Sequence, residues 1–150
     1  MIVDTSAIIA LLLREPEGPA FARMITMSPV VRMSAAGYVE LGIVADRRRD
    51  PRLTGAIDPL IDDLRILIEP LTERQARIAR TAFQRFGKGT GHPARLNMGD
   101  CFAYALARDF GEPLLFKGDD FSHTDIELVT TPYRQRRLSE VIASYGERPA

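Results

Sequence analysis

The chain has 150 residues, of which 45% are hydrophobic, and 20 basic residues balance 20 acidic ones to a formal net charge of zero. This length fits one domain with a single core. A neutral chain has no overall field that would draw it onto nucleic acid or an anionic membrane. Any site for a polyanion must therefore be a local patch.

Nothing in the sequence predicts export or a membrane span. No apolar run approaches the roughly 20 residues that cross a bilayer, and the start Met-Ile-Val-Asp lacks the basic region of a signal peptide. The single cysteine, Cys101, excludes an intramolecular disulfide and fits a reducing compartment, where we expect it to be buried packing. We expect a cytoplasmic protein with no membrane partner.

The first half of the chain predicts strands that alternate with helices. Hydrophobic spacing and breakers predict strands at 2–3, 30–33 and 66–68 and helices at 5–14, 17–27, 35–49 and 51–64. In the helix at 35–49 the apolar face is expected to carry Ala36, Val39, Ile43 and Val44.

The second half continues the alternation. A helix is predicted at 72–86, a glycine-rich loop at 87–93, a helix at 98–110, and strands at 113–116 and 126–129. Strands separated by helices need crossover connections, which favour a mainly parallel sheet covered on both faces. The predicted fold class is α/β, a three-layer α/β/α domain.

Carboxylates recur at positions that this fold would bring together. Asp4 follows the first strand and the pair Asp119 and Asp120 follows the strand at 113–116, so these acids are expected at the carboxyl edge of the sheet. Glu40 lies on the apolar stripe of its helix, and Asp100 lies in the first turn of another. Clustered carboxylates raise one another's pKa unless a cation neutralises them. Oxygen donors indicate Mg²⁺, with Mn²⁺ possible, over zinc.

Local structure offers a second explanation for three of these acids. Asp4 is a favoured helix N-cap, and Asn97 with Asp100 fits a capping arrangement. Asp119 and Asp120 fit a turn in the segment Gly-Asp-Asp-Phe. Glu40 has no such local explanation, because a charge in the middle of an inward helical face needs a partner. The coincidence of the four positions favours a functional site.

Four motifs carry a resemblance to a known family. They are Met-Ile-Val-Asp-Thr-Ser-Ala at 1–7, Tyr-Val-Glu-Leu-Gly at 38–42, Leu-Asn-Met-Gly-Asp-Cys-Phe-Ala-Tyr-Ala at 96–105, and Leu-Leu-Phe-Lys-Gly-Asp-Asp-Phe at 114–121. In this order and spacing the chain resembles the PIN-domain VapC toxins of bacterial type II toxin–antitoxin systems. The resemblance covers 1–131 as a PIN-like nuclease domain and leaves 132–150 as an extension without an assigned role.

The resemblance implies a Mg²⁺-dependent endoribonuclease that hydrolyses RNA. Asp4, Glu40, Asp100 and Asp120 match the family's catalytic acids, with Asp4 and Asp100 expected as direct metal ligands. Asp119 stands beside the fourth acid as an alternative to Asp120. Thr5 or Ser6 is expected to orient Asp4 or a phosphate.

The same resemblance implies two protein partners, a second copy of the chain in a homodimer and a VapB-like antitoxin whose segment reaches the acids. Apolar helix faces near the amino terminus would offer that segment a groove, but they fit an ordinary core or a dimer surface equally well. Those faces carry Ile9, Leu13, Phe21 and Met24.

Three rival functions are weaker. A HAD-like phosphohydrolase needs a second aspartate two residues after the first, where this chain has Ser6, and Lys117 lies too close to Gly118 for that arrangement. A receiver-type binding module needs an aspartate after a middle strand, where Glu69 and Pro70 follow the strand at 66–68. A catalytically idle PIN scaffold that only binds partners stays open.

Overall fold

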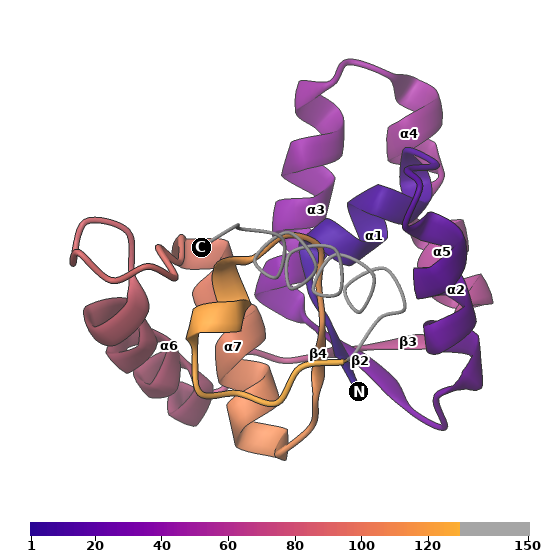
Figure 1. The fold of residues 1–150 in the computed structure, drawn as a ribbon. Coiled ribbons are helices and arrows are strands. Elements are labelled where there is room, and N and C mark those ends of the chain that lie inside the picture. The colour runs from indigo at the N-terminus through magenta and orange to yellow at the C-terminus, as the bar shows by residue number, and fades with distance from the viewer. Residues whose placement is uncertain (130–150) are drawn as a thin grey trace, which may run out of the picture.

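The computed structural model describes residues 1–129 (Figure 1), so the extension predicted at 132–150 lies outside the described residues. One parallel sheet runs in the order β3-β2-β1-β4. Ile2 of β1 stands opposite Arg32 of β2 on one side and Leu114 of β4 on the other. The strands are β1 (Ile2–Val3), β2 (Val31–Ser34), β3 (Ile66–Glu69) and β4 (Leu114–Leu115).

Helices cover both faces of this sheet, which confirms the three-layer α/β fold (Figure 1). Successive side chains of a strand point to opposite faces, so Ile2 packs in the cluster of α6 (Glu73–Phe86) and α7 (Met98–Phe110), whereas Val3 packs in the cluster on the other face. That other face carries α1 (Thr5–Leu12), α2 (Gly18–Met27), α3 (Ala35–Arg47), α4 (Pro51–Gly55) and α5 (Ile57–Asp63). No helix within residues 1–129 has the length and apolar character needed to span a membrane.

The strand order creates a switch point between β1 and β4. From β1 the chain proceeds outward through β2 and β3, and it then returns to place β4 on the opposite side of β1. In open parallel sheets such a point leaves a crevice beyond the carboxyl ends of the strands, where ligands bind. Asp4 directly follows β1, and the segment from Phe116 to the short helix η1 (Asp120–His123) follows β4.

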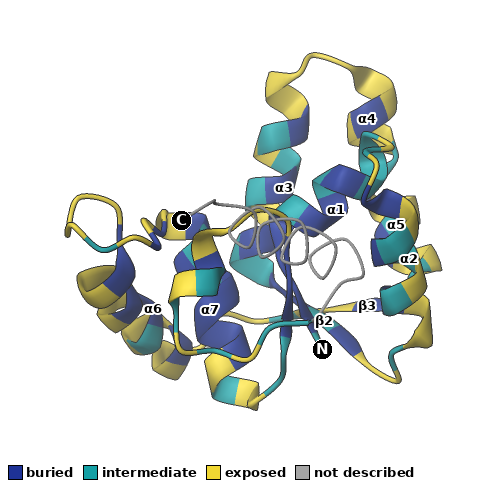
Figure 2. Cartoon of the chain, viewed as in Figure 1, coloured by how far each residue is buried: buried dark blue, intermediate teal, exposed yellow. Residues whose placement is uncertain are grey.

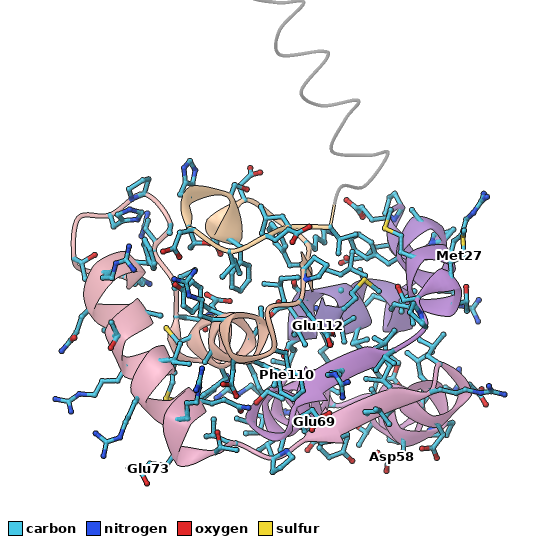
Figure 3. All side chains as sticks on the ribbon, turned by 90° about the horizontal axis from the view of Figure 1, so that it is seen from below. Met27, Asp58, Glu69, Glu73, Phe110 and Glu112 are labelled. Carbon is cyan, nitrogen blue, oxygen red and sulfur yellow. The ribbon has the colours of Figure 1, made fainter. Side chains whose placement is uncertain are left out.

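The opposite edge of the sheet is tied by charged side chains (Figure 3). Glu112 accepts a hydrogen bond from the amino-terminal ammonium at 2.5 Å and another from Arg32 Nε at 3.1 Å. Arg32 also pairs with Glu69 and lies over the ring of Phe110, 4.7 Å from its centre. These contacts join β1, β2 and β3 to the segment between α7 and β4, and so hold the sheet together below the crevice.

Two predicted elements are wrong in detail. The helix expected at 51–64 is broken into α4 and α5, because Pro59 has no N–H to donate to the carbonyl of Gly55. The strand expected at 126–129 is reduced to a single bridge between Leu128 and Leu114, since β4 offers only two residues for pairing.

The groove suggested near the amino terminus is mostly core. Phe21 is fully packed, and Ile9, Leu13 and Met24 are partly buried against the same cluster. Of the alternatives that the sequence left open, ordinary core therefore holds for Phe21. The open surface between α1 and α2 is instead a hollow of about 450 Å³, lined by Leu11, Arg14, Glu15, Pro16, Gly18, Pro19 and Ala22.

The buried face of α3 also differs from the predicted one (Figure 2). Gly37, Leu41 and Ala45 are buried, whereas Val39 is 57% and Ile43 is 47% exposed. Gly37 faces β2 and α1, where a methyl group in its place would make ordinary contacts with Met33 and Thr5. The contacts that α3 makes with the core, which hydrophobic periodicity does not report, therefore set the orientation of this helix.

This orientation predicts unequal costs for two truncations on one helix. Leu41→Ala should lower the free energy of unfolding by about 2–5 kcal/mol, because it leaves a cavity in the core. Ile43→Ala should cost less than about 1 kcal/mol, because half of that side chain already faces solvent. Urea unfolding of both variants measures the difference, and equal costs would contradict the observed orientation.

Candidate functional site

Asp4 is buried at the carboxyl end of β1, where it also caps α1. Its Oδ2 accepts hydrogen bonds from the Ser6 backbone N–H at 2.9 Å and from the Ser6 hydroxyl at 2.5 Å. Burial raises the pKa of Asp4 above its usual range, the bonds from Ser6 and Thr5 oppose that rise, and the charge of Asp120 adds to it. The capping explanation is thus confirmed. In addition, burial and the charge of Asp120 disfavour the ionised form of this carboxylate.

Ser6 joins Asp4 to the segment that follows β4. Its hydroxyl oxygen accepts a hydrogen bond from the backbone N–H of Lys117 at 3.0 Å while the hydroxyl donates to Asp4. The two segments that meet at the switch point are therefore fixed to each other through one side chain. The expectation that Ser6 orients Asp4 is confirmed.

Glu40 comes from the middle of α3 and is half-buried. Thr5, one of the two residues expected to orient Asp4 or a phosphate, places its side-chain hydroxyl 3.1 Å from Glu40 Oε2 and 3.2 Å from the carbonyl oxygen of Gly37. Burial raises the pKa of Glu40, the contact with Thr5 lowers it, and the charge of Asp4 raises it further. The partner that the sequence required for this charge is a hydroxyl from α1.

Asp100 closes a capping box at the start of α7. Its backbone N–H donates to Asn97 Oδ1 at 2.9 Å, and the Asn97 backbone N–H donates to Asp100 Oδ2 at 2.7 Å. Burial raises the pKa of Asp100 to about 7, against the bond from Asn97 and with the help of the charges of Asp4, Asp120 and Glu40. The predicted capping role is confirmed, and the coupling to three other carboxylates exceeds what capping explains.

Asp120 opens η1 and is exposed. Its charge raises the pKa of both Asp4 and Asp100, so it stands on the same side of the crevice as they do. Asp119 precedes η1, and its carbonyl accepts a hydrogen bond from the Ser122 backbone N–H at 2.9 Å. The turn explanation therefore holds for this pair alongside the electrostatic coupling of Asp120.

The donor chemistry of these acids fits a hard divalent cation. All four supply carboxylate oxygen, whereas zinc would favour histidine or cysteine. Within residues 1–129 no three acidic, histidine or cysteine side chains are close enough together to hold an ion by themselves. That arrangement still suits Mg²⁺, which protein sites commonly bind through one or two carboxylates while it keeps several waters.

Two other polar residues near the acids, Cys101 and Lys117, have structural roles. Cys101 is buried, and burial together with the charge of Asp100 raises the pKa of its thiol to about 11, so it is packing and not a nucleophile. Lys117 forms ion pairs with Glu15 at 2.6 Å and Glu17 at 3.5 Å. A lysine neutralised by two glutamates gives no support to the phosphohydrolase alternative.

Comparison with known proteins identifies the family. A model of the PIN domain matches residues 1–127, so the chain is a PIN-domain protein. It is 55% identical over 127 residues to ribonuclease VapC28 of Mycobacterium tuberculosis, an alignment that covers 85% of this chain and 96% of the relative. Within the PIN domains the chain therefore belongs to the VapC ribonucleases.

Solved structures show the same fold at low sequence identity. VapC20 of Mycobacterium tuberculosis, a sarcin–ricin loop cleaving toxin, superposes with a TM-score of 0.66 at 23% identity, covering 85% of this chain and 97% of that one. VapBC2 of Rickettsia felis, solved bound to a DNA fragment from its promoter, gives a TM-score of 0.67 at 12% identity, covering 87% and 97%.

The raised pKa of Asp100 predicts how the metal-free protein responds to pH. The proton of Asp100 is held more tightly in the folded state, with a pKa of about 7 against the ordinary aspartate value of 3.8. Its contribution to stability is therefore complete below about pH 4 and is lost as pH rises through 7. The melting temperature in EDTA should therefore fall between pH 5 and pH 8.

The variant Asp100→Asn keeps an acceptor for the capping bond and cannot ionise, so it should flatten this fall. Some decline will persist, because the pKa values of Asp4 and Glu40 are raised as well. The exposed substitution Asp63→Asn is the matched control and should keep the wild-type profile. A wild-type melting temperature that rises over this range would contradict the electrostatic description of the site.

Proposed function

We propose that this chain is the toxin of a VapBC-type toxin–antitoxin system, a Mg²⁺-dependent endoribonuclease whose catalytic acids are Asp4, Glu40, Asp100 and Asp120. The observation that carries the proposal is that Asp4, Glu40 and Asp100, from three separate segments, lie buried or half-buried at the β1/β4 switch point, where burial and the charges of neighbouring acids, Asp120 among them, raise their pKa values. Such an arrangement is costly for folding and is characteristic of functional sites. It fits the ribonuclease family to which the chain belongs.

Asp4 and Asp100 are the proposed direct ligands of Mg²⁺, with Mn²⁺ as an alternative ion. They are held in place by Ser6 and Asn97 respectively, as ligating carboxylates commonly are. Glu40 and Asp120 would act through water. A divalent ion at this position supplies an activated water and neutralises charge on the phosphate. The chain's own part is to fix the acids and to orient the RNA phosphodiester against them.

RNA binding by a net-neutral protein needs a local basic surface, and we propose the hairpin tip between α3 and α4. The hairpin projects beyond the sheet (Figure 1) and carries exposed Arg47, Arg48, Arg49 and Arg52. None of the four forms an ion pair with another residue in the described part of the chain. Arg48 follows Glu40 by eight residues, which is about 12 Å along a helix.

The cleavage reaction tests the proposed function directly. Purified protein should cleave RNA in Mg²⁺ and stop in EDTA, and Asp4→Asn or Asp100→Asn should lower kcat by about 10²-fold or more while the circular dichroism spectrum stays that of the folded wild type. Cleavage by either variant at the wild-type rate would exclude its substituted residue from the catalytic site. Absence of cleavage by the folded wild-type protein would leave the idle-scaffold alternative standing.

The arginine tip makes a separate prediction about substrate binding. The double variant Arg48→Gln/Arg49→Gln should raise KM several-fold with kcat nearly unchanged, and should lower the slope of log affinity against log salt by about 0.7 for each lost phosphate contact. Arg23→Gln/Arg65→Gln removes two exposed charges away from the tip and is the matched control. Equal effects from both pairs would show that only net charge matters.

We also propose an antitoxin partner encoded beside this gene, since another protein of the same fold, from Klebsiella pneumoniae, is described as part of a toxin–antitoxin complex. A basic side chain from the partner, placed among the acids, would replace the charge of the metal and prevent its binding. The proposed compartment is the cytoplasm, where the RNA lies. The proposed assembly is a homodimer, supported by exposed apolar side chains such as Val39, Ile43, Phe83 and Met98.

Expression in cells tests the partner. This chain alone should arrest growth, and the product of the neighbouring reading frame should restore growth and co-purify with the chain. The variant Asp4→Asn should be harmless alone and should still bind the partner if it folds as the wild type does. If the product of the neighbouring frame neither binds the chain nor restores growth, the assignment as a toxin fails and only the assignment as a nuclease remains. Light scattering of the free chain tests whether it forms a homodimer.

A further inference from the structure

Gly99 occupies the second position of α7, directly before Asp100, and faces Glu40 across the site. A Cβ built at Gly99 would coincide with the carboxylate of Glu40, well inside van der Waals contact with Oε1, Oε2 and Cδ. The carboxylate of Glu40 thus fills the space in which any other residue at position 99 would place its side chain.

The backbone at Gly99 does not itself require glycine. Within residues 1–129 the glycines with positive φ are Gly89, Gly91, Gly111 and Gly118, and Gly99 is not one of them. Alanine is favoured over glycine in a helix. The helix would therefore gain from a side chain at this position, and what a side chain would disturb is the placement of Glu40.

Other helical glycines of the chain lack this constraint. A Cβ at Gly42, two residues from Glu40 on α3, would meet nothing within 4 Å. A Cβ at Gly37 would make ordinary contacts, 3.5 Å from Met33 Cε and 3.6 Å from Thr5 Oγ1. The overlap with a carboxylate is specific to position 99.

We infer that Gly99 is a positioning residue for Glu40, and that its missing side chain lets this carboxylate lie against the first turn of α7 beside Asp100. The hydroxyl of Thr5 also holds Glu40, donating to Oε2 at 3.1 Å. Glu40 is thereby kept close enough for its charge to act on Asp100 although the two acids come from different helices. The inference rests on the proposed function, in which both acids serve the same ion and phosphate.

The test is Gly99→Ala, with Gly42→Ala as the matched control. Gly99→Ala should melt at the wild-type temperature or above it, yet bind Mg²⁺ more weakly and cleave RNA about 10- to 100-fold more slowly, the range seen when a residue that orients a ligand is lost. A crystal structure of the variant should show the Glu40 carboxylate displaced. Gly42→Ala should retain wild-type metal affinity and cleavage.

A double-mutant cycle separates positioning from a general structural effect. In the Glu40→Ala background the added methyl group has room, so Gly99→Ala should fold and cause no further loss of Mg²⁺ affinity or cleavage. Wild-type affinity and cleavage in Gly99→Ala, or an equal loss with and without Glu40, would overturn the inference. So would a double variant that fails to fold.

The same measurements keep the two proposals distinguishable. If the wild-type protein does not cleave RNA, the proposed function fails, whereas Mg²⁺ affinity and the observed position of Glu40 in Gly99→Ala still decide the role of Gly99. If the wild type cleaves and Gly99→Ala cleaves equally well, the ribonuclease assignment stands and the role of Gly99 is rejected.

Discussion

The burial of carboxylates beside one another at the β1/β4 switch point is the constraint on which the rest of this structure depends. Asp4, Glu40 and Asp100 all have raised pKa values, with burial as the leading cause and the other acids adding to it. The chain offsets this cost with a specific donor for each acid: Ser6 for Asp4, Thr5 for Glu40 and Asn97 for Asp100. These donors keep the acids near one another without neutralising them, and a divalent cation would remove the repulsion that is left.

The scaffold holds this arrangement from both ends of the sheet. At the carboxyl edge, the Ser6 hydroxyl links β1 to the segment after β4. At the opposite edge, Arg32, Glu112 and the amino-terminal ammonium form a connected charge network. Strands of two to four residues give few ladder hydrogen bonds, so side-chain links of this kind carry a large share of the registration between strands that positions the acids.

Structural and functional explanations of a residue are compatible here. Asp4 is an N-cap, and Asp100 belongs to a capping box. Capping places a carboxylate at the positive end of a helix dipole and fixes its rotamer, which are the same properties that a metal ligand needs. A residue that explains the start of a helix can therefore also belong to a catalytic site, and the local explanation does not lower the value of the functional one.

The sequence by itself determined the layer architecture and the parallel sheet, because hydrophobic periodicity and the alternation of strands with helices are local properties of the chain. It also marked Asp4, Glu40, Asp100 and the pair Asp119 and Asp120 as candidate site residues. Tertiary structure alone decided which face of α3 is buried, since that depends on which residues of the helix meet the core formed by the other elements. It also decided that Thr5 serves Glu40 and that Glu40 lies where a side chain at Gly99 would be. Such contacts join residues 35 to 59 positions apart, and no spacing rule along the chain encodes them, because they arise only when separate helices pack together.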